Sequence, residues 1–368
     1  MYAIVDIMRF FIGEQHVRYW KSYIMGVYLR FVRFFIADFK LILSGDIDKV
    51  EETKNKRSFF MVNHQTELDW IFSCYFLQMF DKESDFSAVM KGSLGKIPIL
   101  GPVVQDLNMC LLDRHWETDQ DHFRHFLERF ESHPCAECVF FCPEGTTITR
   151  ASYERSKSFA QRSNRPKFEH VLLPRSTGLA FIIKELREWE ENTGESVYLY
   201  NITMQFEGYS GEICSDDNYG REVDVTFPSF ENSFWKRIPI GCHMHVEVVP
   251  LSSIVDKEMR DADSINKQTE KWLDQKWIEK ENELEYFTKH QSFDAEWTKN
   301  QVLSCCMSDL QRIENFNLIH RIRDLVPCLI LLGIALLLDI VVFKGIRGLI
   351  YALLKYRVCL NCAIYGEK

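Results

Sequence analysis

A histidine and an aspartate stand five positions apart in the stretch "MVNHQTELDW", residues 61–70. A neutral imidazole can act as a general base near pH 7, and a carboxylate on its other ring nitrogen would hold the tautomer. On one continuous helix the side chains of His64 and Asp69 would point roughly 140° apart. They meet only if the helix begins after His64, as the strand-like "SFFMVN" and the helical pattern from Leu68 onward indicate. We therefore predict a strand-to-helix junction that brings the pair together.

Helix capping is a simpler role for the same aspartate. Thr66 followed by Asp69 three positions later resembles a capping box, in which the carboxylate satisfies the first backbone amides of a helix. Capping pairs are common and catalytic dyads are rare, so the spacing alone favours capping. Further motifs are needed to choose between the two roles.

A second candidate site is the turn that follows the apolar run "CVFF". Pro143 and Glu144 lead into Gly145, which permits a tight turn. Thr146 then offers a hydroxyl and an amide to an anion. Because many strands end in a turn that contains proline and glycine, this signal is weak by itself.

The composition argues against several classes of site. The net charge of −9 does not favour a nucleic-acid partner held by bulk electrostatics. The twelve cysteines show no disulfide framework, and the two Cys-x-x-Cys pairs, beginning at Cys135 and Cys359, do not predict a zinc site. His243 and His245 fit the exposed face of a strand better than a metal site. The chain also lacks a serine-hydrolase elbow and a Walker phosphate loop, so neither a serine nucleophile nor ATP is indicated.

The elements that must position these residues alternate along the chain. Residues 45–255 contain short apolar runs separated by charged stretches with helical spacing, such as 117–132 and 178–192. The expected strands are "SFFMVNH", "CVFFCPEG", "HVLLP", "VYLYNITMQFEG" and "MHVEVVPL". This pattern predicts an α/β domain with a largely parallel sheet flanked by helices. We expect a charged helical region over residues 256–320. Within it, the pattern of residues 256–291 predicts a solvated helix on the domain surface.

Two further regions indicate contact with a lipid bilayer. Residues 1–44 contain a stretch rich in aromatic and aliphatic side chains that cations interrupt regularly, which suits helices at the membrane interface. Amphipathic helices packed on the domain itself are an equal alternative. Near the other end, residues 321–368 include the apolar run 325–343, which has the single charge Asp339 and is long enough to span a membrane. We expect a transmembrane or re-entrant segment there, followed by a tail.

Four motifs in order make the chain resemble the glycerolipid acyltransferases. These are Asn63-His64-x4-Asp69, "DRHW" at 113–116, "PEGT" at 143–146 and "VLLPRSTG" at 171–178. Within that family the chain is most similar to the branch of lysocardiolipin and related lysophospholipid acyltransferases, which shares the pattern of residues 91–101 and the "PRSTG" form. The resemblance covers roughly residues 45–255.

The resemblance implies an acyl-CoA-dependent enzyme of phospholipid remodelling or biosynthesis, which acylates a lysophospholipid at a membrane such as the endoplasmic reticulum. It makes His64 the general base that deprotonates the acceptor hydroxyl, with Asp69 as its partner. Acyl-CoA is then a co-substrate, and neither a metal nor a further cofactor is implied. Lys91 would serve the phosphate or the CoA, although a solvated surface lysine is an equal alternative.

The resemblance also implies which residues contact the glycerol phosphate of the acceptor. At the matching positions these are Arg114, Glu144, Gly145 and Thr146. A guanidinium gives the planar, charge-assisted pairing that phosphate favours. For Arg114 alone, a surface salt bridge with Asp113 or Glu117 would be the simpler role. The Glu144 carboxylate can only accept hydrogen bonds, so we expect it to bind a hydroxyl or to orient an arginine.

Two departures from the family pattern bear on the acceptor. Many members read Phe-Pro-Glu-Gly-Thr-Arg, whereas this chain has Cys142 in place of the aromatic residue and Thr147 in place of the arginine. The lost cation favours a lysolipid with a larger headgroup over lysophosphatidic acid. Three alternatives stay open: a 1-acylglycerol-3-phosphate acyltransferase, a CoA-independent transacylase and a non-catalytic lipid-binding scaffold.

Overall fold

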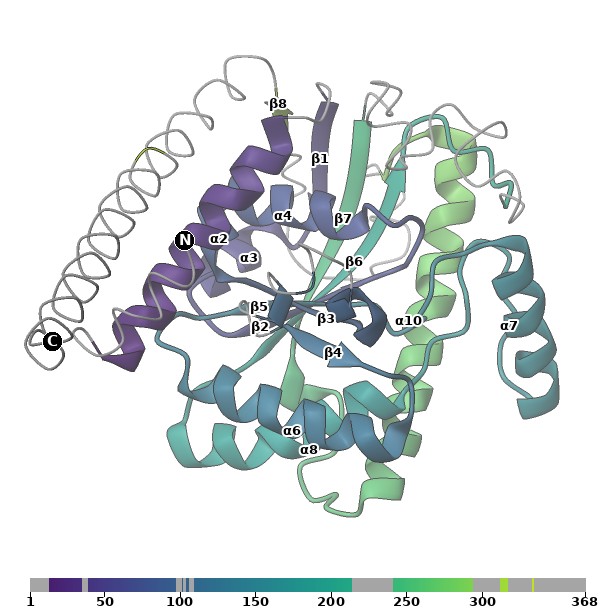
Figure 1. The fold of residues 1–368 in the computed structure, drawn as a ribbon. Helices are drawn as coiled ribbons and strands as arrows, with labels where there is room; N and C mark the ends of the chain where they lie inside the picture. Colours follow the sequence, from purple (N-terminus) through teal and green to yellow (C-terminus); the bar gives the residue numbers. More distant parts are fainter. Residues whose placement is uncertain are drawn as a thin grey trace, which may run out of the picture.

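The computed structural model describes residues 13–34, 39–96, 101, 104–105, 109–213, 241–293, 312–316 and 333. Its strands form one sheet in the order β4-β3-β5-β2-β6-β7-β1-β8, and helices cover both faces (Figure 1). The strands are β1 (Phe39–Gly45), β2 (Ser58–Val62), β3 (Phe86–Lys91), β4 (Cys110–Leu112), β5 (Cys138–Phe141), β6 (Tyr198–Phe206), β7 (Gly241–Pro250) and β8 (Arg312–Phe316). The longer helices are α2 (Glu14–Phe34), α3 (Ile47–Thr53), α4 (Asp69–Met79), α6 (Trp116–Ser132), α7 (Arg150–Ser163), α8 (Thr177–Thr193) and α10 (Ala262–His290).

The sheet is mostly parallel, which confirms the predicted α/β class. Every pairing among β4, β3, β5, β2 and β6 is parallel. The sheet reverses at β7, which runs antiparallel to β6 and parallel to β1, and β8 adds a second antiparallel pairing at the edge. The predicted helices over 117–132 and 178–192 correspond to α6 and α8.

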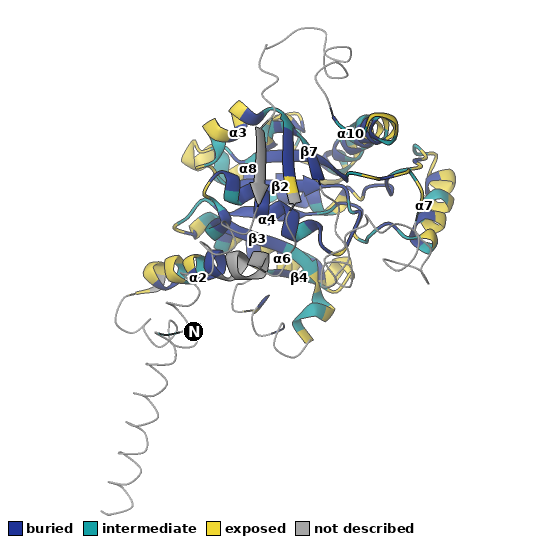
Figure 2. Ribbon diagram, turned by 90° about the horizontal axis from the view of Figure 1, so that it is seen from above, coloured by how far each residue is buried: buried dark blue, intermediate teal, exposed yellow. Residues whose placement is uncertain are grey.

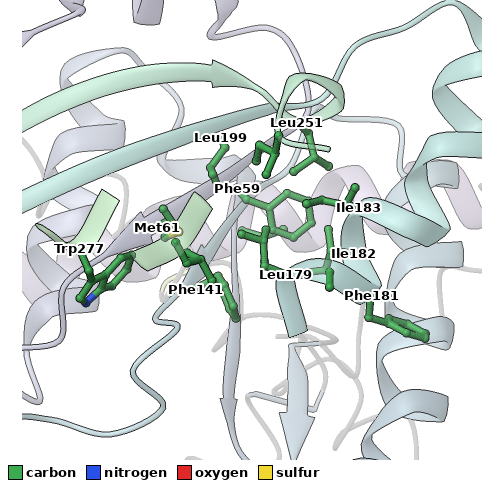
Figure 3. Close-up of a cluster of buried hydrophobic side chains, with 14 of the residues drawn as sticks. Phe59, Met61, Phe141, Leu179, Phe181, Ile182, Ile183, Leu199, Leu251 and Trp277 are labelled. Carbon is green, nitrogen blue, oxygen red and sulfur yellow. The ribbon is translucent and has the colours of Figure 1, made fainter. Parts of the chain in front are cut away.

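Each central strand has two buried faces. In β2, the side chains of Phe60 and Val62 pack in a cluster with α4, while those of Phe59 and Met61 pack on the opposite face with α6, α8 and α10. Figure 3 shows Phe59 among the labelled side chains of this second cluster. Viewed from above, the strands form the buried middle layer between helices with exposed outer faces (Figure 2). Burial on both faces explains why β2 has a continuous apolar sequence instead of an alternating one.

Helix α10 differs from the predicted solvated surface helix. It begins after Asp261, whose carboxylate accepts a hydrogen bond from Ser264 N at 2.9 Å. Further along the helix, Trp277 and Lys280 are fully buried, at 0% and 1% exposure. The Lys280 ammonium donates to Ile202 O of β6 at 2.6 Å. The prediction is wrong for this face of the helix, because the charged residues around it conceal an apolar stripe that packs on the sheet.

The same helix changes the environment of the two histidines in β7. The ring of His243 is buried against Phe287 of α10, and its Nε2 lies 3.4 Å from Glu207 Oε1. His245 Nδ1 lies 3.0 Å from Ser44 Oγ in β1. The predicted exposed strand face is therefore wrong at His243. Over the part of the chain that the structure describes, no group of three or more histidine, cysteine, aspartate or glutamate residues is arranged to hold a metal ion.

The run "HVLLP" at 170–174 is an irregular segment and not the predicted strand. Three of its backbone amides donate to side chains instead of to a neighbouring strand. His170 N donates to Glu281, Leu172 N to Glu144 and Leu173 N to the Ser156 hydroxyl. An apolar run can thus be buried without joining the sheet when polar side chains accept its amide hydrogens.

The N-terminal region contains both a helix and a strand. Helix α2 packs against the short helix η1 (Glu83–Asp85) and β3, with Val17 and Met25 buried, as the packed amphipathic alternative predicts. Residues 39–45 form β1, where the sequence predicts helix up to residue 44, because β7 offers this apolar run a parallel neighbour.

The apolar run 325–343, with Asp339, lies outside the described residues apart from Gly333. Within the described ranges, no helix has the length and apolar character needed to cross a membrane. The predicted transmembrane or re-entrant segment therefore stays a prediction.

Gly45 ends β1 in a conformation that a side chain would disturb. Its φ is +88°, and an added Cβ would collide with the carbonyl oxygen of Val246 in β7. Gly194, after α8, has a similar φ of +70° but no atom within 4 Å of such a Cβ. We expect Gly194→Ala to cost about 1–2 kcal/mol from the left-handed backbone alone, and Gly45→Ala to cost more. Thermal unfolding of the two variants would measure the difference, and an equal loss of Tm would contradict the predicted collision.

Candidate active site

The histidine of the predicted pair follows the end of β2, where Asn63 takes the chain out of the sheet. The Asn63 side chain accepts a hydrogen bond from Met204 N at 2.8 Å and donates one to Met204 O at 3.0 Å. This amide group continues the pairing with β6 while the backbone turns away. His64 is therefore fixed immediately beyond a buried strand end.

Helix α4 begins at Asp69, so the two residues of the pair lie on opposite sides of a strand-to-helix junction, as predicted. His64 Nδ1 lies 3.0 Å from Asp69 Oδ2. The Asp69 side chain is 0% exposed, and the His64 side chain is 22% exposed. The arrangement leaves the imidazole reachable from solvent while its carboxylate partner is enclosed.

The Asp69 carboxylate also accepts backbone amides of the loop before α4, although it does not form the predicted capping box. Its Oδ2 accepts hydrogen bonds from Gln65 N at 2.7 Å and Thr66 N at 3.0 Å. The Thr66 hydroxyl accepts from Leu68 N at 2.9 Å, and the N-cap of α4 is Leu68, which makes no side-chain cap hydrogen bond. The same carboxylate oxygen therefore meets both the loop amides and the imidazole. The amides fix the carboxylate independently of the histidine.

Glu144 lies below the turn and does not face solvent. It is 3% exposed, and it accepts hydrogen bonds from His64 N at 3.2 Å, Leu172 N at 3.3 Å and Trp277 Nε1 at 3.3 Å. Burial raises the pKa of Glu144 to about 7, although the nearby His64 and these hydrogen bonds oppose the shift. This geometry differs from the expected contact with a hydroxyl or an arginine. The carboxylate instead holds the His64 backbone, the Leu172 backbone and the Trp277 indole in place.

The turn at 142–148 binds both backbone groups of His64, its N–H through Glu144 and its carbonyl through Ile148. Gly145 has φ +71°, and its amide donates to Cys142 O at 3.1 Å. Ile148 N donates to His64 O at 3.0 Å. Gly145 is exposed at the tip of the turn, followed by the half-buried Thr146. The exposed part of this turn is thus held beside the histidine.

Arg114 reaches the same turn from the loop between β4 and α6. Its Nη2 donates to Gly145 O at 2.6 Å. Its φ of +67° is unusual for a residue with a side chain. Among the described residues the structure shows no ion pair from Arg114 to Asp113 or Glu117, so the simple salt-bridge role is not observed. Lys91 is exposed at the end of β3, and the described contacts do not join it to this cluster.

The electrostatic environment of His64 favours its protonated form. Burial lowers the pKa of the imidazole, but the Cys142 sulfur and the Asp69 carboxylate raise it, and the pKa lies well above its usual value. Cys142, which the sequence singles out only as a departure from a family pattern, therefore contributes to the pKa of His64.

Trp277 is a residue of this site that the sequence did not indicate. It lies on α10, more than 130 positions after Glu144, and its indole reaches the carboxylate from the far side of the turn. The available signal was weak, because one tryptophan in a charged helix does not reveal which buried acceptor it meets. The apolar spacing of Leu273, Trp277 and Leu284 is the one feature of the sequence that could have indicated a buried face.

Comparison with known proteins identifies related sequences. Residues 46–205 match the sequence model of the acyltransferase family. Lysocardiolipin acyltransferase 1 of Gallus gallus is 27% identical over 74% of this chain and 63% of its own length. Probable 1-acyl-sn-glycerol-3-phosphate acyltransferase 5 of Arabidopsis thaliana is 26% identical over 71% of this chain and 60% of its length. The 2-acyl-1-lysophosphatidylinositol acyltransferase of Saccharomyces cerevisiae is 24% identical over 63% of this chain and 61% of its length. The chain thus spans less than two thirds of the length of each of these relatives.

Asp69→Asn should lower the pKa of His64. The change removes the carboxylate that favours the charged ring, while the burial that disfavours it remains. NMR titration of histidine-labelled protein would measure this, with His64→Ala to assign the signal. The pair should also stabilise the fold fully below the unfolded histidine pKa of about 6.5, and this stabilisation should be lost as the pH rises through the higher folded pKa. An unchanged or raised pKa in the variant would contradict the assignment.

Trp277→Phe should destabilise the fold, because it keeps an aromatic ring but removes one hydrogen-bond donor from the buried Glu144 carboxylate. Losing such a partner costs about 1–3 kcal/mol. Thermal unfolding would measure the loss. Trp272→Phe is the matched control, since Trp272 is half-buried on the same helix and makes no described contact with Glu144. Similar losses in the two variants would show that the indole hydrogen bond contributes little.

Proposed function

From the premise that residues 46–205 are an acyltransferase-family domain, we propose that the protein transfers a fatty acyl group from acyl-CoA to a hydroxyl of a lysophospholipid. The observation that carries the proposal is the contact of 3.0 Å between His64 Nδ1 and Asp69 Oδ2 at the end of β2. The partly exposed ring lies beside a turn to which an exposed arginine is bonded. A base next to a cation suits an acceptor that carries both a hydroxyl and a phosphate.

The proposed reaction has a simple course. With Nδ1 bound to Asp69, the other ring nitrogen of neutral His64 takes the proton of the acceptor hydroxyl while its oxygen attacks the thioester carbonyl. The new ester C–O bond forms, the C–S bond breaks, and the proton passes from the imidazolium to the leaving CoA sulfur. Asp69 stabilises the imidazolium in between. Because the resting pKa of His64 is raised, activity should increase with pH as the ring loses its proton.

Arg114 and the exposed turn at Gly145 and Thr146 support a phosphate-bearing acceptor. Thr147 in place of an arginine favours a lysolipid with a larger headgroup, and relatives carry names for lysocardiolipin and lysophosphatidylinositol. A relative named for 1-acylglycerol-3-phosphate supports the smaller acceptor as the second candidate. Lys91 stays a candidate contact for phosphate or CoA.

We place the reaction at a bilayer surface. Tyr19, Trp20 and Tyr23 are exposed on α2, with their rings in edge-to-face contact. Such amphipathic rings are enriched at membrane–water interfaces. The apolar run 325–343 would add a firmer attachment, and the endoplasmic reticulum is the membrane that the family resemblance implies.

The test is release of CoA thiol by purified full-length protein with oleoyl-CoA and, in turn, lysophosphatidic acid, lysophosphatidylinositol and lysocardiolipin. We expect release with at least one acceptor and a loss of at least about a hundredfold in His64→Ala, the contribution usual for general-base catalysis. His125→Ala is the matched control, because His125 is exposed on α6.

Retained activity in His64→Ala would remove the histidine from the mechanism. Acyl transfer from a diacyl phospholipid without thiol release would instead identify a transacylase that uses the same pair. If no acceptor is acylated by either route, the proposed function fails for these acceptors, and the weight moves to another acceptor or to a lipid-binding scaffold.

A further inference from the structure

Two arginines from different segments meet at the tip of the turn beside His64. Arg114 comes from the loop before α6 and donates to Gly145 O at 2.6 Å. Arg175 comes from the segment before α8, and its Nε and Cζ lie 3.7 and 3.8 Å from the position that a Cβ on Gly145 would occupy. Both arginines are exposed. The absence of a side chain at Gly145 therefore leaves the two guanidinium groups next to the same small piece of backbone.

The backbone around Arg175 is held at three successive residues. Arg175 N donates to Pro143 O at 2.9 Å, which ties it to the turn. The preceding Pro174 O accepts from Arg165 Nη2 at 3.0 Å, and the following Ser176 hydroxyl donates to Asn266 of α10 at 2.8 Å. Because the backbone is already fixed, binding a ligand orders only the arginine side chain and adds no backbone entropy cost.

Among the described residues, no carboxylate forms an ion pair with Arg175, in contrast to Arg165. Arg165 Nη2 lies 2.6 Å from Asp274 Oδ1, and its Nη1 lies 3.2 Å from Glu270 Oε2. Within the described ranges, neither Arg114 nor Arg175 has an ion pair with a carboxylate. The fold thus uses one arginine of this region to fasten α10 and keeps two exposed cations beside the turn.

We propose that Arg175 binds the phosphate group of the acceptor together with Arg114, so that two guanidinium groups enclose one anion at the Gly145 turn. This inference rests on the proposed function. A planar guanidinium pairs with phosphate oxygens through two parallel hydrogen bonds, and two such groups hold a tetrahedral anion in one orientation. Because the turn is bonded to His64, the bound phosphate would fix the distance from the acceptor hydroxyl to the imidazole. Arg175 is therefore a residue for recognition of the acceptor.

Steady-state kinetics of full-length Arg175→Gln would test this, with oleoyl-CoA and the best of lysophosphatidic acid, lysophosphatidylinositol and lysocardiolipin. We expect KM for the lysophospholipid to rise about tenfold, the effect of one charge-assisted hydrogen bond, with KM for oleoyl-CoA unchanged. For Arg175→Lys we expect a KM for the lysophospholipid between those of the wild type and Arg175→Gln, because lysine keeps the charge but lacks the planar guanidinium. Arg162→Gln, which removes an exposed arginine at the far end of α7, should resemble the wild type.

A second acceptor, which lacks phosphate, shows whether Arg175 binds phosphate or only supports the fold. Monoacylglycerol has the hydroxyl but no phosphate, so any acylation of it should be equal in Arg175→Gln and the wild type. An equal loss with this acceptor would show that Arg175 supports the structure and would overturn the inference. A rise in KM for oleoyl-CoA alone would also overturn it, by assigning the anion site to the phosphates of CoA.

Binding of glycerol 3-phosphate, measured by titration calorimetry, distinguishes failure of the inference from failure of the proposed function. The wild type should bind it at least several-fold more tightly than Arg175→Gln. If the wild type acylates none of the acceptors, the proposed function fails, but binding that depends on Arg175 would still support the anion site. Equal binding by the two proteins, or no binding by either, would overturn it.

Discussion

The buried carboxylate of Glu144 connects three segments that lie far apart in the sequence. It accepts the amide of His64, the amide of Leu172 and the indole N–H of Trp277. A carboxylate enclosed by protein is costly unless such donors surround it. The junction at β2, the irregular segment before α8 and the long helix α10 must therefore all be in place together. The position of the imidazole depends on this requirement as much as on its own aspartate.

The register of the sheet explains why these groups meet. In the parallel pairing of β2 with β5, Met61 lies opposite Phe141. His64 comes three residues after Met61, and Glu144 comes three residues after Phe141. The two segments that follow β2 and β5 therefore leave the sheet side by side, at the carboxyl ends of the strands. Parallel strands place their carboxyl ends together, and binding sites of open α/β sheets commonly form there. The candidate active site thus lies where the adjacent strands β2 and β5 end in register.

The sequence indicated the parts of the site that depend on local pattern. The change from strand to helix spacing around His64 placed the pair at a junction, and the glycine turn after β5 was evident from its residue types. The role of Glu144 was not evident. The "PEGT" motif alone does not show that the Glu144 carboxylate will be enclosed by hydrogen-bond donors from three segments. "HVLLP" was mistaken for a strand for the same reason. Trp277 and Arg175 meet the turn only through tertiary packing, and although Arg175 belongs to the "VLLPRSTG" motif, that motif does not show which turn it meets.

The contact between Trp277 and Glu144 also defines how much of the chain must stay together. The sequence model of the family covers residues 46–205, whereas α10 ends at His290. A shortened protein cut at the limit of that match would keep the histidine, the aspartate and the turn, yet the carboxylate beneath them would be open to water on the side where the indole now lies. The minimal autonomous unit is therefore longer than the region by which its relatives are recognised, and truncation or domain exchange should preserve the chain through α10.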